Sequence, residues 1–118
     1  MTQARSIAIG PRHWIEGVEY RQQAEIETYV ARGDWHRDTL GDALRRTALE
    51  VPMKPAVISD EGVLSFGDLD RRSEAVAAGL LDAGLRPGDR LLWQVGINAE
   101  FFVAFYGCLK AGLVPVCT

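Results

Sequence analysis

Strand and helix signals alternate from residue 55 to residue 117, and the loops between them are short. Apolar and partly β-branched runs at residues 55–59, 90–95 and 113–117 indicate strands, and the segments between them carry apolar side chains at helical spacing. A strand–helix–strand–helix–strand order predicts two successive right-handed βαβ crossovers. The sequence therefore predicts an α/β fold that begins a doubly wound parallel sheet.

A less regular arm precedes this pattern. Gly10-Pro11 interrupts the chain, and the unevenly spaced apolar side chains of residues 16–31 predict a helix that lies on a surface and ends at residues 33–34. We therefore expect two parts: a partly helical arm, residues 1–38, and the start of a large domain, residues 39–118.

Capping signals mark the three helices expected after the arm. The residues that precede them all accept hydrogen bonds from first-turn N–H groups: Thr39, Ser65 and Asn98. An aspartate lies three residues after each of the first two, as in a capping box. Helix-ending residues follow in turn: Pro52, Gly84 and Gly112. The first helix should bury Leu40, Ala43, Leu44, Thr47 and Ala48, and the second Leu69, Ser73, Val76, Ala77, Leu80 and Leu81.

The strands at residues 90–95 and 113–117 carry consecutive apolar residues, so both faces of each strand should be covered. Cys108 and Cys117 lie among apolar residues at a spacing that matches no zinc or redox motif, which predicts buried thiols in a reducing compartment. A strand that begins at Val114 needs neighbouring strands and covering helices. We therefore expect the chain to be the front part of a larger protein and its exposed strand edges to favour self-association.

The balance of charged and apolar residues excludes several classes of protein. With 47% hydrophobic residues and a net charge of −3, the chain is neither a disordered tail nor a basic nucleic-acid binder. Its basic doublets, residues 45–46 and 71–72, are isolated. The apolar stretch at residues 101–109 ends at Lys110 and is shorter than the ~20 residues of a membrane-spanning helix. Residues 1–14 lack the apolar segment of a secretory signal, so we expect a cytoplasmic protein.

The loops in which chemistry is expected lack the corresponding motifs. The loop after residues 90–95 has no Gly-rich phosphate-binding pattern, and Asn98 within it is expected to cap a helix rather than bind an anion. Residues 36–38 (HRD) imitate a kinase catalytic triplet, but Ala43 stands where the metal-binding asparagine should be. Two histidines lack a second ligand at a metal-binding spacing: His13 and His36.

The other polar and aromatic candidates have structural explanations. Ser65 and Ser73 lie at a helix start and within a helix, not in a nucleophile elbow. The acidic side chains of the second helix are expected to face its N-terminus or solvent: Asp68, Asp70 and Glu74. Three aromatic residues form either an interaction patch or, as we favour, contacts that hold the arm on the domain: Trp14, Tyr20 and Trp35. We expect no catalytic, cofactor-binding or metal-binding residue in the chain.

Four segments nevertheless resemble motifs of the adenylate-forming enzymes, in the family's order and spacing. Residues 63–70 (VLSFGDLD) resemble the L-T-Y-x-E-L motif, and residues 84–91 (GLRPGDRL) resemble the G-h-x-x-G-D-x-V turn. Residues 98–101 (NAEF) resemble the N-x-x-E helix start, and residues 109–116 (LKAGLVPV) resemble the L-K-A-G-x-x-x-V-P motif. Each motif is weak alone, and the four together are fairly specific.

The arm resembles one branch of this family. Residues 29–42 (YVARGDWHRDTLGD) are similar to the G-Y-W-x-x-x-T-L-G-D segment of stand-alone aryl-acid ligases, such as 2,3-dihydroxybenzoate–AMP ligases. Asp34 replaces the tyrosine of that segment, and Gly96-Ile97 replaces the Leu-Pro that usually precedes the asparagine. These differences leave both aryl-acid ligases and general acyl-CoA synthetases open.

The resemblance implies a parent enzyme that activates a carboxylic acid with MgATP and transfers the acyl group from the adenylate to a thiol of coenzyme A or phosphopantetheine. The family's nucleotide, acid-pocket and hinge motifs follow the matching segment, so no catalytic residue carries over to residues 1–118. The implied partners are the remainder of the parent enzyme and its carboxylic acid substrate. The chain alone is expected to be inactive. A stand-alone α/β interaction or regulatory module without catalysis is the alternative.

Overall fold

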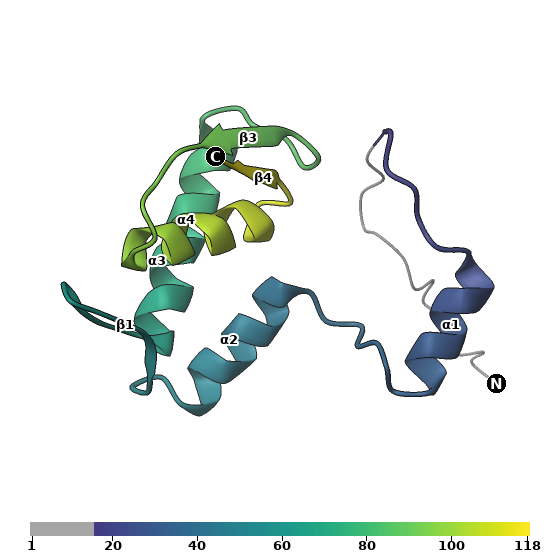
Figure 1. Cartoon of the computed structure of the whole chain (residues 1–118), viewed down its shortest axis with the longest axis horizontal. Helices are drawn as coiled ribbons and strands as arrows, with labels where there is room; N and C mark the ends of the chain where they lie inside the picture. Colours follow the sequence, from purple (N-terminus) through teal and green to yellow (C-terminus); the bar gives the residue numbers. More distant parts are fainter. Residues whose placement is uncertain (1–15) are drawn as a thin grey trace. The chain divides into compact units, whose positions relative to one another are not determined.

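The computed structural model describes residues 16–118, in two compact units that divide between Arg37 and Asp38. Four helices and four strands follow one another along the described residues (Figure 1). The expectations for Gly10-Pro11, His13 and Trp14 concern residues outside the described part.

The first unit contains one helix, α1 (Gln23–Ala31), within its described residues. It begins later than the expected residues 16–31 because the chain is in a left-handed conformation at Gly17 and extended at Gln22, which gives no side-chain cap. Beyond the helix, Gly33 adopts a φ of 80°, and the backbone N–H groups of Asp34 and Trp35 donate to the Tyr29 carbonyl oxygen. The predicted end of the helix is confirmed.

The second unit opens with α2 (Leu40–Glu50), and its predicted capping box is confirmed. The Thr39 hydroxyl accepts from the Asp42 N–H at 3.1 Å, and the Asp42 carboxylate accepts from the Thr39 N–H at 3.0 Å. Leu44 and Ala48 are buried as expected. Leu40, which was expected to be buried, is 59% exposed in the first turn of the helix.

The next two strands, β1 (Pro55–Ser59) and β2 (Gly62–Ser65), form an antiparallel hairpin. The expectation of two successive crossovers is therefore wrong for the first of them. That crossover was predicted to lead from residues 55–59 through the following helix to residues 90–95, but β1 and β2 form a sheet of their own and the strand at residues 90–93 belongs to a second sheet. Gly62 supplies the positive φ of 136° in the hairpin turn. One face of the hairpin packs on the core, and the other carries an exposed apolar pair, Ile58 opposite Val63.

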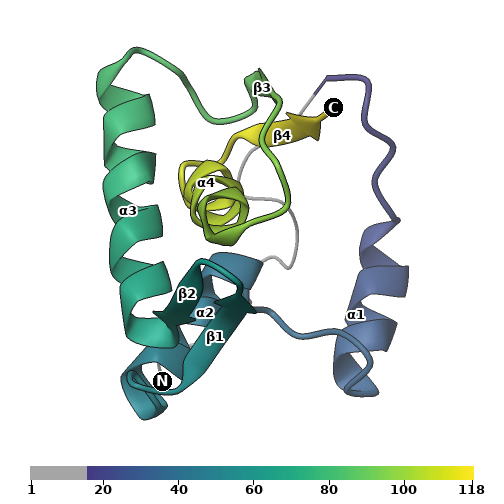
Figure 2. The same ribbon diagram turned by 60° about the vertical axis from the view of Figure 1, so that its left-hand side comes forward.

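The second predicted crossover is confirmed. After α3 (Phe66–Asp82), β3 (Arg90–Trp93) leads into α4 (Ala99–Lys110) and then into β4 (Val114–Cys117). The strands β3 and β4 pair in parallel, with Arg90 opposite Val114 and Trp93 opposite Cys117. Figure 2 shows α4 end-on beside α3, with the hairpin and the β3–β4 pair at different ends of the helical layer. The mixed helix-and-strand fold is as predicted.

Two clusters of buried side chains fill the second unit. One joins α2, the hairpin, α3 and α4: Leu44, Leu64, Leu69 and Val103. The other joins α3, α4 and the approach to β4: Ala77, Cys108, Ala111 and Leu113. Both clusters include side chains of α3 and of α4, so this helix pair is the centre of the unit.

Several residues expected to be covered are exposed. Leu92 is 67% exposed and stands opposite Val116 on the face of the β3–β4 pair that points away from the core residue Leu91. Cys117 is also exposed, and Leu81 lies beside the buried stripe of α3 rather than within it. The prediction that both faces of these strands are covered is wrong for the described residues, because α4 packs against one face only. None of the described helices is both long and apolar enough to cross a bilayer.

Candidate functional site

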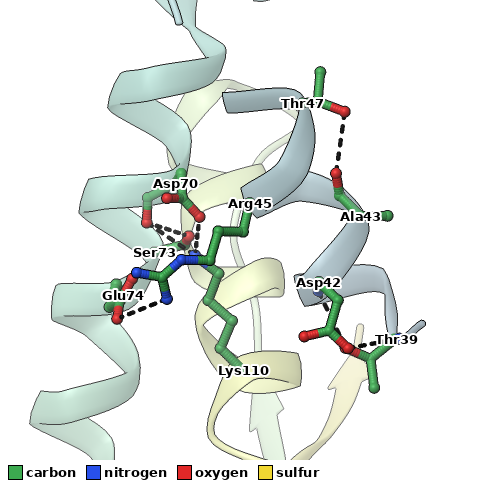
Figure 3. Close-up of polar contacts among 9 residues, drawn as sticks. All are labelled: Thr39, Asp42, Ala43, Arg45, Thr47, Asp70, Ser73, Glu74 and Lys110. Atoms are coloured by element: carbon green, nitrogen blue, oxygen red, sulfur yellow. Dashed lines mark hydrogen bonds and ion pairs between the residues drawn. The ribbon is translucent and has the colours of Figure 1, made fainter. Parts of the chain in front are cut away.

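The main polar centre of the second unit lies where α2, α3 and α4 meet. Lys110, the last residue of α4, donates from Nζ to Oδ1 of Asp70 at 2.6 Å and to the Asp70 carbonyl oxygen at 2.9 Å (Figure 3). The two side chains are only 13% and 17% exposed. Ser73 is fully buried, and its hydroxyl donates to the same carbonyl oxygen at 3.0 Å. We call Gly41, Asp70, Ser73 and Lys110 the helix junction.

Two glycines bring the backbones close enough for the helix junction to form. A β-carbon at Gly41 would lie 3.2 Å from Cγ of Lys110. The helix α2 therefore comes close to the Lys110 side chain at a position where α2 itself has no side chain. A β-carbon at Gly107 would lie 2.5 Å from Cγ1 of Val76, so α3 and α4 cross at close range. The Asp70–Lys110 contact therefore depends on two positions without a side chain, Gly41 in α2 and Gly107 in α4.

Ion pairs flank the helix junction on its exposed sides. Arg45 of α2 contacts Glu74 of α3 at 3.6 Å (Figure 3), and Arg72 of α3 contacts Glu100 of α4 at 2.5 Å. A further pair joins Arg46 to Asp38. These side chains are about half exposed, so each pair adds little to stability, typically up to about 1 kcal/mol.

The helix junction is suited to holding helices together rather than to catalysis. Lys110 is engaged with a carboxylate and a carbonyl oxygen, and Asp70 with the lysine, so neither offers a free acid, base or nucleophile. Among the described residues, no group of three or more His, Cys, Asp or Glu side chains gathers to hold a metal ion. The arrangement orients α4 against α3.

The acidic candidates of α3 have different surroundings. Asp68 pairs with Arg71 at 2.6 Å near the helix start, as expected for a first-turn charge. The expectation that Asp70 faces solvent is wrong, because its partner Lys110 covers it from α4. Sequence reasoning missed this pair, since the partners are forty positions apart and no local spacing relates them. The one available signal was a lysine at the end of a helix that is apolar after its first turn.

The remaining candidates take the structural roles that the sequence suggested. Oδ1 of Asn98 accepts from the Phe101 N–H at 3.1 Å, and the Ser65 hydroxyl accepts from the Asp68 N–H at 3.1 Å, so both cap helices. In the arm, Trp35 stacks on Tyr29 at 5.0 Å between ring centroids. That contact lies within the arm itself.

An aromatic cluster beside α4 was not predicted. Trp93, at the end of β3, stacks on Phe101 at 5.0 Å, and Phe101 in turn stacks on Phe105 at 6.1 Å. The indole Nε1 of Trp93 is buried without a hydrogen-bond partner among the described residues. The aromatic cluster fixes the end of β3 over the first turns of α4.

The two thiols differ in environment. Burial raises the pKa of the Cys108 thiol above its ordinary value, and Cys117 adds a smaller upward effect. A raised pKa keeps Cys108 protonated near neutral pH, which makes it a poor nucleophile. Cys117 is exposed at the end of β4, so the expectation of two buried thiols is right only for Cys108.

A comparison with protein families matches residues 44–118 to the model described as AMP-binding enzyme. The salicyl-AMP ligase / salicyl-S-ArCP synthetase of Mycobacterium tuberculosis is 37% identical over 94 residues, which cover 75% of this chain and 17% of that protein. The vibriobactin-specific 2,3-dihydroxybenzoate-AMP ligase of Vibrio cholerae is 33% identical over 94 residues, 80% of this chain and 17% of that protein.

Solved structures show the same likeness. The apo structure of MbtA from Mycobacterium smegmatis has a TM-score of 0.72 and 40% identity, over 77% of this chain and 18% of that one. A fatty acyl-adenylate ligase from L. pneumophila has a TM-score of 0.63 and 33% identity, over 68% of this chain and 15% of that one. The chain therefore spans about 17% of the length of the curated relatives it matches.

Proposed function

Because the chain belongs to the AMP-binding enzyme family, we propose that it forms the N-terminal part of an ATP-dependent aryl-acid–AMP ligase. The observation that supports this proposal best is the identity with the salicyl-AMP and 2,3-dihydroxybenzoate-AMP ligases, together with the motifs at residues 63–70 and 109–116. The proposed activity joins a carboxylate oxygen of the acid to the α-phosphorus of ATP with loss of pyrophosphate. The acyl group then moves to a thiol with loss of AMP.

The basic side chains around the helix junction do not fit an ATP–Mg²⁺ site. A triphosphate needs unengaged cationic side chains or a glycine-rich loop, and the described cations near α2, α3 and α4 already pair with carboxylates: Arg45, Arg46, Arg71, Arg72 and Lys110. We therefore assign ATP, Mg²⁺ and the acceptor thiol, from coenzyme A or phosphopantetheine, to the rest of the enzyme. The reaction is proposed to take place in the cytoplasm.

This chain would contribute a scaffold to the enzyme. In our proposal residues 39–118 begin the large domain and residues 1–38 form an arm before it. The parallel pair of β3 and β4, packed on α4, is the beginning of a sheet to which further strands would be added. The helix junction holds α4 against α3, and the aromatic cluster holds the end of β3 against α4.

The remainder of the enzyme is the proposed partner of the exposed sheet face. Leu92 and Val116 face the same side of the β3–β4 pair and are 67% and 37% exposed. Exposed apolar side chains on unpaired strands promote association with other chains. The chain alone is therefore expected to self-associate through these strands, and in the whole enzyme the same surface would be covered.

A fatty-acid ligase is the second candidate function, supported by the likeness to the fatty acyl-adenylate ligase from L. pneumophila. A stand-alone interaction or regulatory module is not favoured, because the salicyl-AMP and 2,3-dihydroxybenzoate-AMP ligases that this chain resembles are several times longer than it.

Acid-dependent exchange of labelled pyrophosphate into ATP distinguishes these candidates. The full-length protein that contains this chain is assayed with salicylate, 2,3-dihydroxybenzoate, a medium-chain acid and a long-chain acid. Exchange that depends on the aryl acids supports the proposal. Exchange with the fatty acids alone supports the second candidate, and exchange with none of the acids contradicts both.

A further inference from the structure

The helices α3 and α4 meet along two rows of residues with matching four-residue spacing. The buried row of α3 is Leu69, Ser73 and Ala77, and that of α4 and its cap is Val103, Gly107 and Ala111. Leu69 shares one buried cluster with Val103, and Ala77 shares the other with Ala111. Rows of this spacing are the ridges along which helices pack.

Small and apolar side chains repeated every turn distinguish poorly between neighbouring registers. A slide of α4 by one turn, about 5.4 Å along its axis, again brings the two rows together, with Val103 or Ala111 in the place of Gly107. The strand β4 starts four positions after Lys110, so such a slide would also move β4 along β3. The observed pairing of Arg90 with Val114 therefore needs a feature that distinguishes these registers, either the close approach at Gly107 or the Asp70–Lys110 pair.

The Asp70–Lys110 pair forms in one register only. A slide of one turn would carry Nζ of Lys110 well beyond bonding distance of Oδ1 of Asp70, from which it is now 2.6 Å away. The next acidic residue one turn along α3, Glu74, is already in contact with Arg45 of α2 at 3.6 Å. Because Asp70 and Lys110 are largely buried, a register that separates them leaves unpaired charges in a poorly solvated place.

We propose that the Asp70–Lys110 pair is a registration device: it selects the position of α4 along α3, and through α4 the starting point of β4 in the parallel sheet. A buried polar pair of this kind contributes specificity at little net gain in stability, since well-packed apolar replacements of both partners stabilise about as well. Single polar residues that set the register of helix pairs act in the same way.

Gly107 offers the competing explanation. Its missing β-carbon accommodates Val76, and a one-turn slide would place Val103 or Ala111 there instead. If this close approach alone selected the register, the ion pair would be dispensable for it. Removing both charges while leaving Gly107 in place separates the two explanations.

The test compares three variants of the 118-residue chain by backbone amide NMR and by urea unfolding. Lys110→Met leaves Asp70 unpaired and should reduce the folding equilibrium constant about a hundredfold or more. Asp70→Leu/Lys110→Met should regain most of that loss but give more than one set of amide signals for residues 90–117. The matched control, Arg72→Met/Glu100→Leu, removes the exposed α3–α4 pair and should keep one set of signals.

Three results would overturn the proposal. One is a single set of signals in Asp70→Leu/Lys110→Met, with the contacts between Arg90 and Val114 retained. Another is a double variant that unfolds as readily as Lys110→Met or does not fold, which would make the pair a source of stability instead. The third is several sets of signals in the unaltered chain at a concentration at which sedimentation velocity shows it to be monomeric.

Discussion

Gly107 of α4 faces Val76 of α3 so closely that a β-carbon at position 107 would lie 2.5 Å from Cγ1 and 2.8 Å from Cβ of the valine. The same β-carbon would lie 3.2 Å from the carbonyl oxygen of Ser73, which belongs to the helix backbone. Relief of this overlap requires both the valine and the α3 backbone to move. The short distance between α3 and α4 at this point therefore depends on the missing side chain at residue 107.

Gly107→Ala should lower the free energy of unfolding by about 1–3 kcal/mol, the usual cost of overpacking a core, despite the higher helix propensity of alanine. Urea unfolding followed by circular dichroism measures the change. Gly79→Ala is the matched control, because Gly79 lies within α3 with open space around its Cα. That substitution should stabilise the chain by up to about 1 kcal/mol. Equal effects of the two substitutions would contradict the close crossing.

Asn98→Ala should lower the free energy of unfolding by about 1 kcal/mol, because the first turn of α4 loses the acceptor of the Phe101 N–H. Asn98→Asp keeps a side-chain oxygen at the cap and should retain most of the stability. Both are measured by thermal unfolding. A melting temperature of Asn98→Ala equal to that of the unaltered chain would show that the cap contributes nothing.

Leu92→Lys should weaken self-association of the isolated chain, since it places a charge at the centre of the exposed face of the β3–β4 pair. Sedimentation velocity over a range of concentrations measures the association. Ile58→Lys is the control on the hairpin, where the side chain is similarly exposed. The account would be contradicted by loss of association in Ile58→Lys with none in Leu92→Lys.

Iodoacetamide at neutral pH should modify Cys117 and leave Cys108 unmodified until the chain unfolds, because Cys117 is exposed and Cys108 is buried. Mass spectrometry of the digested chain at several times gives both rates. Burial raises the pKa of the Cys108 thiol above its ordinary value, so the folded state holds this proton more tightly than the unfolded state does. The contribution of this thiol to the free energy of unfolding is fully present below the pKa of the unfolded state. It is lost as the pH rises through the pKa of the folded state. Rapid modification of Cys108 in the folded chain would contradict its burial.

The local signals predicted most of the secondary structure and few of the tertiary relationships. Thr39, Ser65 and Asn98 all cap helices as expected, because capping depends on residues within one turn. Residues 55–59 were predicted to begin a series of crossovers, whereas they form a hairpin with residues 62–65. The alternating burial of β3 was also missed, because consecutive apolar residues predict a fully covered strand whether or not the covering element lies in the same chain.

The helix junction was the least predictable feature. Asp70 and Lys110 are forty positions apart, so only the crossing of α3 and α4 brings them together. That crossing depends in turn on Gly107, whose role is invisible without the position of Val76. The motif at residues 109–116 contains this lysine, and its resemblance to the family identified the segment without giving the contact that Lys110 makes.

The most direct test of the proposed function assays the 118-residue chain and the full-length protein side by side for pyrophosphate exchange with salicylate and 2,3-dihydroxybenzoate. We predict acid-dependent exchange by the full-length protein and none by the 118-residue chain at the same molar concentration. Acid-dependent exchange by the 118-residue chain alone would contradict the assignment of the ATP site to the rest of the enzyme. If the full-length protein showed no exchange with either acid, the proposal that it is an aryl-acid–AMP ligase would be contradicted.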